Sequence, residues 1–539
     1  MRRRLLLLVA AFTVGLPTAA LAATITGTNR ADRLRGTPQA DSLLGRGGDD
    51  RLDGLGGNDL LDGGSGRDAL ATGAGDDRVA ASYDGARDTV RCGRGKDLVD
   101  ADLDDKVAPD CEVVVRRLSR DPFRNSDSQH ETEAEPASSA FGSTIVTAFQ
   151  AGRFANGGAS SIGFAASSDG GRTWRSGFLP ALTTLSSPPG TSVRASDPTV
   201  AYDAEHRVWL IGSLAIGRDQ WQLLVNRSAN GTAWSPPITA AAAPAQTLDK
   251  GWLACDNWPS SPLRGRCYLS YLDVPANQIA TRTSTDGGLT WSSAATTPTR
   301  SEIEVNGAQP LVRPDGTLVV VYASFSNRRF EESEVLAIRS ADGGASFTEP
   351  VRVAALQAAA LGEIRSPPLP SAAVDSGGRL YTVWEDCRFV SGCSRNDLVL
   401  SSSDDGVTWS DPVRLPTTPA TASAHSLVPG LAADSTSRRL AVVYYTLPVG
   451  CATRPTCAGV GAEEISSADG GGTWSPPQRL DTEPMKLSWI AADAEAGHML
   501  GDYEAVSFVS GRAVPIFALA VAPSGSGHFR QAIYARTRG

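Results

Sequence analysis

Histidine, positive charge and long apolar runs are all scarce in this chain. It has five histidines, and its eight cysteines show no C-x-x-C spacing, so a zinc centre is not expected. The formal net charge of −9 argues against nucleic acid as a partner, because the phosphate backbone binds basic surfaces. After Leu16 no apolar run approaches the roughly 20 residues that a membrane-spanning helix needs, so no membrane span is expected.

The first residues form a targeting pattern. Arg2-Arg3-Arg4 precede an apolar run from Leu5 to Leu16, and Ala20-Leu21-Ala22 follows it. A basic start, a short apolar core and small residues before the cleavage point are typical of a secretory signal peptide. The sequence therefore predicts a signal peptide over residues 1–22, cleaved after Ala22. We expect the mature protein to be secreted, extracellular and monomeric.

The cysteines fall into four close pairs along the chain. An even number of cysteines in an exported protein indicates disulfides. We predict bridges between nearest neighbours, each of which closes a short loop as a local staple. The predicted pairs are Cys92 with Cys111, Cys255 with Cys267, Cys387 with Cys393, and Cys451 with Cys457.

Residues 24–112 carry a nonapeptide repeat. Aspartates recur at every ninth position from Asp32 to Asp77, and Asp88 continues the series after a two-residue insertion. A leucine or valine stands two residues after each of these aspartates, and glycines fill the turns. A disordered linker rich in glycine and aspartate would not keep an apolar residue in every repeat, so the pattern favours a folded segment.

The cleanest repeat, GGSGRDAL from Gly63 to Leu70, resembles the RTX nonapeptide G-G-x-G-x-D-x-L-x. The resemblance implies a parallel β-roll that binds calcium as a structural cofactor. Calcium prefers carboxylate and carbonyl oxygens, and glycine turns can aim carbonyls inward. Each nonapeptide makes half a turn, so ligands along one edge lie 18 residues apart. The predicted metal ligands are Asp41, Asp50, Asp59, Asp68 and Asp77.

A second, longer repeat organises the rest of the chain. The octapeptide Ser167 to Trp174 (SSDGGRTW) recurs at steps of 56 to 65 residues, which indicates a closed repeat architecture. Its glycines supply positive φ for a tight turn, and its aspartate can accept hydrogen bonds from backbone amides of the turn. The further copies are Ser228 to Trp234, Ser284 to Trp291, Ser340 to Phe347, Ser402 to Trp409 and Ser467 to Trp474. Their key acid positions are Asp169, Asn230, Asp286, Asp342, Asp404 and Asp469.

These octapeptides resemble the Asp-box of the sialidase family, S-x-D-x-G-x-T-W. In that family the boxes are structural turns remote from the active site, so we assign them to structure rather than catalysis. The resemblance implies an all-β fold, with a sialidase-type β-propeller over residues 130–539. Six units carry a box and a seventh begins at Gly501, so seven blades are favoured, with six as the alternative. Residues 113–129 form a linker, or Val113 to Arg117 supply the strand that the seventh unit lacks.

The loops on the face opposite the octapeptide turns are the expected site. Sialidases hold the substrate carboxylate with three arginines, and use a tyrosine nucleophile, a glutamate that activates it and an aspartate as acid/base. By location, the resemblance implies Arg328, Arg365 and Arg388 as the arginines, Tyr503 as the nucleophile, Glu385 or Glu131 as its partner, and Asp197 as the acid. Other residues expected on this face include Asp249, Lys250, Asn306 and Asp502. The family's F-R-I-P motif is absent; Phe123-Arg124-Asn125-Ser126 keeps only its first half.

Two functions follow from this organisation. The first is a secreted, sialidase-like glycoside hydrolase that acts on extracellular glycans or glycoproteins; as an enzyme, the chain would be an exo-α-sialidase-like glycosidase. The alternative is a non-catalytic, glycan- or protein-binding adhesion propeller with a calcium-stabilised β-roll. The sequence leaves this choice open, because a fold does not determine a function.

Overall fold

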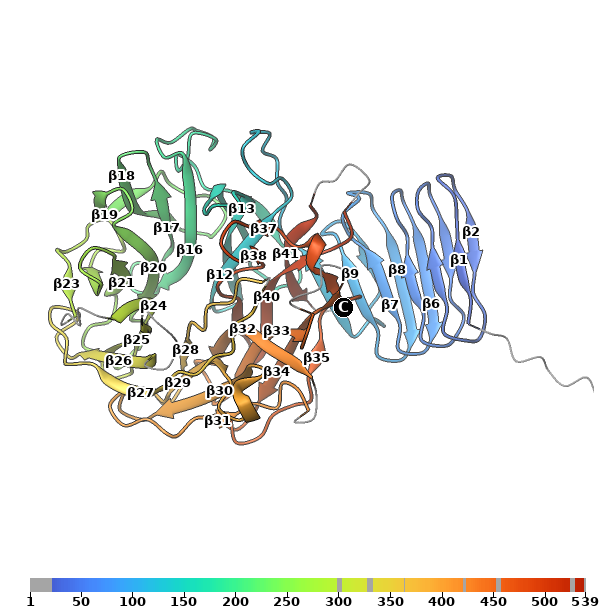
Figure 1. Cartoon of the computed structure of the whole chain (residues 1–539). Helices are drawn as coiled ribbons and strands as arrows, with labels where there is room; N and C mark the ends of the chain where they lie inside the picture. The colour runs from blue at the N-terminus through green and yellow to red at the C-terminus, as the bar shows by residue number, and fades with distance from the viewer. Residues whose placement is uncertain are drawn as a thin grey trace, which may run out of the picture.

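The computed structural model describes residues 22–297, 303–326, 333–362, 364–419, 423–451, 457–523 and 529–537. This part of the chain is all-β, with two short 3-10 turns, η2 (Ser391–Cys393) and η3 (Leu487–Trp489). A ladder of strands lies beside a larger ring of sheets (Figure 1). Within the described ranges, no helix has the length and apolarity that a membrane crossing needs. The predicted signal peptide, apart from Ala22, and Arg328 lie outside the described residues.

The ladder is a parallel β-solenoid of two facing sheets, as the nonapeptides predict. One sheet holds β1 (Thr24–Thr26), β3 (Ser42–Leu44), β5 (Leu60–Asp62), β7 (Arg78–Ala81) and β9 (Leu98–Ala101). The other holds β2 (Arg33–Arg35), β4 (Arg51–Asp53), β6 (Ala69–Ala74), β8 (Thr89–Arg94) and β10 (Lys106–Val107). The repeated leucines and valines, from Leu43 to Val99, are almost completely buried in one cluster. Each buried side chain contributes about 1.5–3 kcal/mol, which favours the regular stacking.

The ring is built from antiparallel groups of four strands. In chain order they are β12 (Glu133–Phe141), β13 (Thr144–Arg153), β14 (Ala159–Ser167) and β15 (Arg175–Phe178); β16 (Arg194–Asp203), β17 (Val208–Ile216), β18 (Gln220–Ser228) and β19 (Ile238–Pro244); β20 (Leu248–Cys255), β21 (Cys267–Asp273), β22 (Gln278–Ser284) and β23 (Ala295–Thr296); and β24 (Ile303–Val312), β25 (Leu318–Ser326), β26 (Glu334–Ser340) and β27 (Val351–Ala355). Next come β28 (Ser371–Val374), β29 (Leu380–Asp386), β30 (Asp397–Ser403) and β31 (Val413–Arg414), then β32 (Ala424–Ala433), β33 (Leu440–Pro448), β34 (Ala458–Ser467) and β35 (Gln478–Arg479). Short strands β36 (Met485–Lys486), β37 (Ala492–Asp493) and β38 (Gly497–His498) follow.

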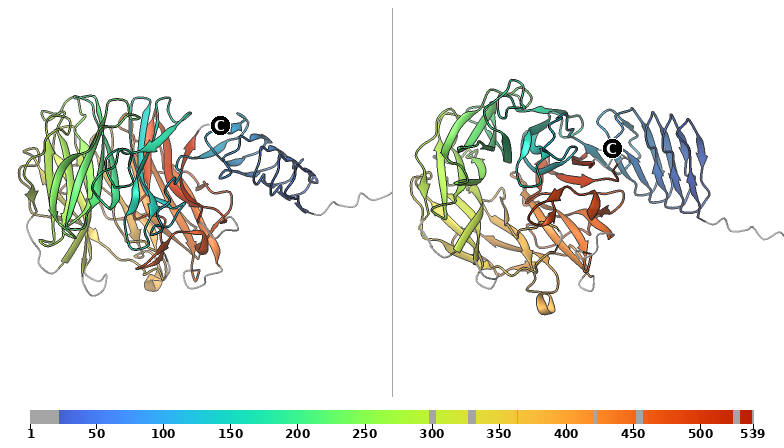
Figure 2. Two further views of the ribbon diagram at one scale, coloured as in Figure 1. Left: turned by 90° about the horizontal axis from the view of Figure 1, so that it is seen from above. Right: turned by 45° about the horizontal axis from the view of Figure 1, so that its top comes forward.

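The last group joins the ring to the solenoid. It contains β39 (Ala505–Val509), β40 (Arg512–Ala520) and β41 (Gln531–Thr537), and its fourth strand is β11 (Val113–Arg117). β11 pairs antiparallel with β41 and parallel with β9, so one continuous sheet runs from the solenoid into the ring. The two further views show the groups standing side by side around the ring, with the solenoid attached at its edge (Figure 2).

The octapeptides form hydrogen-bonded turns between the third and fourth strands. In the first group, Asp169 Oδ1 accepts hydrogen bonds from the backbone amides of Arg172 at 3.0 Å and Thr173 at 2.9 Å, and the Thr173 hydroxyl donates to Asp169 Oδ2 at 2.6 Å. Ser167 pairs with Ile145 at the opposite end of the sheet from Arg153. The octapeptide turns therefore lie on the face of the ring away from the ends of the second strands.

One octapeptide differs from the prediction. Asp404 was expected as the key acid of the copy that ends at Trp409, but Asp405 takes this role. The amide of Thr408 donates to Asp405 Oδ1 at 2.7 Å, and the Ser403 hydroxyl donates to the same oxygen at 3.0 Å. Asp404 instead pairs with Arg379 at the surface, at 3.1 Å. The prediction was wrong because the run SSSDD offers two serine–aspartate registers and the turn forms in its shorter version.

The four predicted disulfides are present. The bridges join Cys92 to Cys111, Cys255 to Cys267, Cys387 to Cys393, and Cys451 to Cys457. The first ties β8 of the solenoid to Cys111, two residues before β11. The second joins the facing ends of β20 and β21. The described part of the chain has no free cysteine.

Candidate functional site

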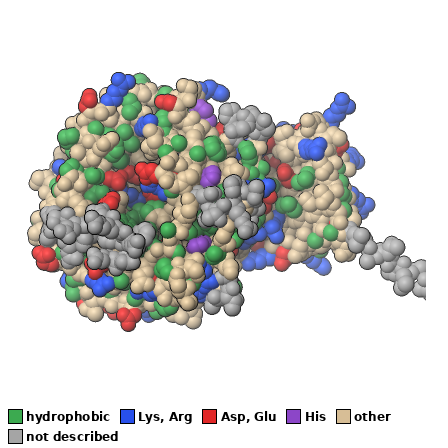
Figure 3. All heavy atoms as spheres, in the orientation of Figure 1, with side chains coloured by type: hydrophobic (Ala, Val, Ile, Leu, Met, Phe, Trp, Pro, Cys, Tyr) green, Lys and Arg blue, Asp and Glu red, His purple; other side chains and the backbone are tan. Residues whose placement is uncertain are grey.

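An acidic cavity opens on the face of the ring opposite the octapeptide turns. Its volume is about 710 Å³, which suits a small-molecule or sugar site. Figure 3 shows acidic side chains gathered around a hollow in the ring. The carboxylates in its wall are Glu135, Asp197, Asp249, Glu304, Asp493, Glu495 and Asp502. The cationic side chains in its wall are Arg153, Arg194, Lys250 and Arg365. Among the described residues, acids outnumber bases in this wall.

Bulges in the first strands of successive groups place three of these side chains. The register of β12 shifts between Ala134 and Ala137, and β16 and β20 shift at the equivalent points. At each bulge one residue has a positive φ: 54° at Glu135, 49° at Asp197 and 42° at Lys250. A bulge re-aims its side chain out of the regular pleat. The local strain therefore brings two carboxylates and one amine together at the cavity.

Lys250 lies at the floor of the cavity. Its side chain is 5 % exposed, and its Nζ has no hydrogen-bond partner among the described residues. Nζ lies 3.1 Å from the centroid of the Tyr503 ring and 5.1 Å from that of Trp252, so aromatic faces partly replace water around the cation. Burial lowers the pKa of Lys250, while the surrounding carboxylates, Glu135 first, oppose that shift.

The carboxylates of the cavity differ in protonation. Burial and the nearby charges of Glu135 and Asp249 raise the pKa of Asp197 well above its usual range. The Asp197 carboxyl makes no hydrogen bond or ion pair within the described residues. Burial would also raise the pKa of Asp502, but hydrogen bonds from Arg365 lower it overall. The site thus combines a carboxyl that favours its neutral form with one that favours its ionised form.

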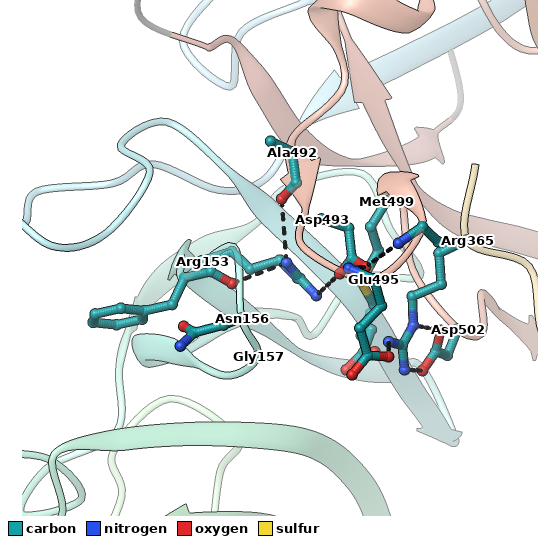
Figure 4. Close-up of polar contacts among 12 residues, drawn as sticks. Arg153, Asn156, Gly157, Arg365, Ala492, Asp493, Glu495, Met499 and Asp502 are labelled. Carbon is teal, nitrogen blue, oxygen red and sulfur yellow. Dashed lines mark hydrogen bonds and ion pairs between the residues drawn. The ribbon is translucent and has the colours of Figure 1, made fainter. Parts of the chain in front are cut away.

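Two arginine–carboxylate pairs hold the rim of the cavity (Figure 4). Arg365 Nε and Nη2 donate to the two oxygens of Asp502 at 2.7 and 2.8 Å, and Nη1 pairs with Glu495 at 3.2 Å. Arg153 Nη2 pairs with Asp493 at 2.7 Å, and both side chains are almost fully buried. Planar guanidinium forks match carboxylates, so these pairs fix the positions of the rim. Both arginines therefore already have a carboxylate partner.

The predicted catalytic residues are only partly assembled. Asp197 and Arg365 line the cavity. Tyr503 lies beneath it, 5 % exposed, and its hydroxyl donates to the carbonyl of Pro198 at 3.3 Å. Burial and then Glu135 raise the pKa of Tyr503 well above its usual value, which disfavours the phenolate that a nucleophile needs.

The other described candidates, Glu385, Arg388 and Glu131, lie outside this cavity wall. Glu385 is fully buried, accepts hydrogen bonds from Ser366, Asn396 and the amide of Val428, and burial raises its pKa to about 7. Arg388 is occupied by Asp386, with Nη2 2.6 Å from Oδ2. Among the described residues, the expected cluster of three arginines is therefore not brought together.

Several cavity residues were not predicted from the sequence. Glu135 has a signal that could have revealed it, because Glu135-Pro136 and Asp197-Pro198 stand at equivalent points of their units. Arg153 and its partner Asp493 have no such signal, since they come from opposite ends of the ring sequence. Glu495 likewise reaches the cavity only through the β37–β38 hairpin.

The turns of the solenoid fit calcium. The amide of Asp50 donates to Asp68 Oδ1 at 2.7 Å and that of Asp59 to Asp77 Oδ1 at 2.8 Å, 18 residues apart in each case. The second oxygens are buried without a hydrogen-bond partner in Asp50, Asp59, Asp68, Asp77, Asp88 and Asp97. Burial raises the pKa of Asp59 and Asp68 to about 7. A bound cation would offset these unpaired carboxylates.

Backbone carbonyl oxygens in the same turns lie close to these carboxylates. A Cβ added at Gly45 would collide with Asp50 Oδ2 and the Gly63 carbonyl, so glycine leaves room between these oxygens. Within the described ranges, no three acidic, histidine or cysteine side chains come together as a metal cluster. Calcium also accepts backbone carbonyl oxygens as ligands. Asp41 differs from the rest, because the amide and hydroxyl of Thr37 bond its Oδ2.

Comparison with known proteins supports the solenoid directly. The family described as the RTX calcium-binding nonapeptide repeat matches residues 26–61 and 45–79. No curated protein matches the chain. The RTX repeats imply calcium binding, and together with the disulfides they are consistent with an extracellular protein.

Solved structures similar to the chain include carbohydrate-active enzymes. A protein of unknown function from Dyadobacter fermentans is 17% identical, with 66% of this chain and 99% of that one covered and a TM-score of 0.43. A leech intramolecular trans-sialidase is 12% identical, covering 61% and 67%, with a TM-score of 0.42. An ulvan lyase is 12% identical, covering 76% and 95%, with a TM-score of 0.45. None of these likenesses decides the function of this chain.

Proposed function

We propose that this protein is a secreted glycoside hydrolase with a seven-bladed, sialidase-like β-propeller, acting on extracellular glycans at the acidic cavity. The observation that carries the proposal is the group of carboxylates around Lys250, whose surroundings push their protonation states apart. Glycosidases use two such groups, one neutral as the general acid and one ionised as base or nucleophile. The calcium-binding solenoid has a structural role beside the propeller.

Asp197 is the proposed general acid. It is 8 % exposed and lines the cavity, and its raised pKa favours the protonated form that a general acid needs. Asp249 is the proposed base or nucleophile, because it lies beside Lys250 in sequence and in the cavity and its Oδ2 accepts a hydrogen bond from Asn306 at 3.4 Å. Burial raises the pKa of Asp249, while the charge of Lys250 and the hydrogen bond from Asn306 oppose that shift and favour the ionised form that a base needs. Both Asp502 oxygens are occupied by Arg365, so Asp502 positions the rim.

A neutral or amino sugar suits this cavity better than sialic acid. The excess of carboxylates would repel a sugar carboxylate. Arg153 and Arg365, which could bind such a group, already pair with Asp493 and Asp502. The finer prediction of an exo-α-sialidase therefore becomes one arm of the test rather than the main proposal.

The test is hydrolysis of fluorogenic glycosides by the mature protein in calcium. The panel contains neutral sugars, amino sugars and a sialic acid glycoside. We expect turnover of a neutral or amino sugar, with kcat lowered about 100-fold or more in Asp197→Asn, because a general acid contributes at least this factor. The rate should fall as pH rises through the pKa of Asp197, since the acid then loses its proton.

Asp404→Asn is the matched control, because Asp404 is an exposed acid in an octapeptide turn. Its rate should equal that of the wild-type protein. Hydrolysis of the sialic acid glycoside alone, lost in Arg365→Ala, would replace the proposal with a sialidase. A folded, calcium-loaded protein that binds glycans but turns over none would establish the non-catalytic adhesion propeller instead.

A further inference from the structure

The one interruption of the nonapeptide series contacts the ring. The extra residues between Asp77 and Asp88 form a turn that includes Ser82 and Tyr83. The Ser82 hydroxyl shares a hydrogen bond with the Tyr534 hydroxyl of β41 at 2.9 Å. An insertion that would otherwise break a regular solenoid therefore projects side chains onto the junction with the ring.

A second pocket lies at this junction, apart from the acidic cavity. Its volume is about 670 Å³, within the range of small-molecule sites. Three parts of the chain build its wall: the inserted turn with Tyr83, the segment that follows β11 with Arg120 and Arg124, and the residues before β41 with Arg530. No residue of this wall lines the acidic cavity.

Three guanidinium groups in this wall make no close ion pair with a carboxylate among the described residues. Arg120, Arg124 and Arg530 make no side-chain hydrogen bond and no ion pair within the described residues. Arg117, also in the wall, differs, because it pairs with Asp102 at 2.7 Å. In a chain with a net charge of −9, unpaired arginines around one pocket are an unusual local excess.

The carboxylates in the same wall are largely engaged by the backbone. The amide of Gly66 donates to Asp84 at 2.9 Å. Asp121 accepts hydrogen bonds from the amides of Phe123 at 2.8 Å and Glu131 at 2.9 Å. These bonds turn the acids toward the protein, although they do not cancel their charge. Glu131 is the third acid, and burial raises its pKa, which favours its neutral form.

Tyr83 adds an uncharged donor. Its ring has the guanidinium of Arg117 4.2 Å from its centroid and that of Arg530 at 5.6 Å. Its hydroxyl oxygen is buried and has no hydrogen-bond partner among the described residues. A buried hydroxyl without a partner costs free energy, so a ligand that supplies an acceptor would be favoured there.

We propose that the junction pocket binds a sugar unit carrying a carboxylate or a sulfate, as part of an acidic glycan. Guanidinium forks match both oxyanions, and the Tyr83 hydroxyl offers the additional polar contact that a sugar ring requires. The pocket spans solenoid and ring, so the ligand contacts both. This proposal does not depend on hydrolysis in the acidic cavity.

Isothermal titration calorimetry of the calcium-loaded protein tests it. The probes are glucuronate, glucosamine 6-sulfate, glucose and inorganic sulfate. We expect one or both anionic sugars to bind and glucose not to, with affinity falling at least tenfold in Arg124→Ala or Arg530→Ala and severalfold in Tyr83→Phe. Affinity should also fall between 50 and 500 mM salt, roughly as screening of exposed charges requires.

Arg172→Ala is the control, because Arg172 is an exposed arginine in an octapeptide turn and lines neither the junction pocket nor the acidic cavity. It removes the same charge and should leave the affinity unchanged. Arg124 is also exposed, so its variant should fold like the wild type. Three results would overturn the proposal. They are binding of inorganic sulfate alone, binding of glucose as tightly as glucuronate, and binding of an anionic sugar whose affinity falls equally in Arg172→Ala.

Discussion

One aspartate organises each octapeptide turn except that of Asn230. In the copy with two adjacent aspartates, Asp404 and Asp405, only Asp405 has this role. The amides of Thr408 and Val407 lower the pKa of Asp405 to about 2. We expect Asp405→Ala to destabilise the protein by about 1 kcal/mol, because several hydrogen bonds in the turn lose their acceptor. Asp404→Ala removes only the surface pair with Arg379 and should cost less than about 0.5 kcal/mol.

Urea unfolding of the two variants measures this difference. The contribution of Asp405 should be present above pH 4 and lost as the pH falls towards its lowered pKa of about 2, because protonation removes the charged acceptor. The difference in the free energy of unfolding between the two variants should therefore become smaller at low pH. An equal loss for both substitutions would mean that Asp404 shares the structural role.

At the scale of the element, the solenoid turn depends on glycine as a spacer. A Cβ at Gly45 would meet Asp50 Oδ2 and the Gly63 carbonyl, two oxygens of the kind that calcium prefers as ligands. We expect Gly45→Ala to weaken calcium binding at least tenfold, measured by calorimetry. Gly56→Ala is the matched control, since its nearest contact is an ordinary 3.5 Å to the Ala74 carbonyl. Equal affinities in the two variants would argue against ligands at these turns.

At the scale of the molecule, one strand belongs to both parts. β11 pairs with β9 of the solenoid and with β41 of the ring. The backbone amide of Asp97 donates a hydrogen bond to the side chain of Glu112, the residue that precedes β11. Without calcium the buried carboxylates of the solenoid repel one another, so its last strands should loosen. Removing calcium with a chelator should therefore increase hydrogen exchange in β41 as well as in the solenoid.

The distant strand β21 is an internal control for this experiment. It pairs only with β20 and β22 and makes no contact with β11, so its exchange should not change. Unchanged exchange in β41, with clear loosening of the solenoid, would show that the two parts are energetically independent. Loosening throughout the ring would show instead that its groups unfold together.

Repeated local patterns were sufficient to predict most of the fold. The nonapeptides specify a parallel solenoid because a leucine every ninth residue can be buried only by regular stacking, and the close cysteine pairs bridge as predicted. The octapeptides specify turns because the aspartate that organises each turn accepts its hydrogen bonds from residues within the same octapeptide, as Asp169 does from Arg172 and Thr173. Even there, the prediction of Asp404 as the key acid was wrong, because the adjacent aspartates offer two registers and the turn forms around Asp405.

The cavity required the tertiary structure. Asp197 and Arg365 were predicted from their place in the repeat, but Arg153 meets Asp493 across 340 residues, and no local pattern records that contact. Burial then decides the chemistry: it keeps Tyr503 protonated, raises the pKa of Asp197 and leaves Lys250 against two aromatic rings. The sequence by itself determined the repeats, because their interactions are short-range and periodic. Only ring closure decided which charged groups meet, because desolvation and Coulomb interactions act through space rather than along the chain.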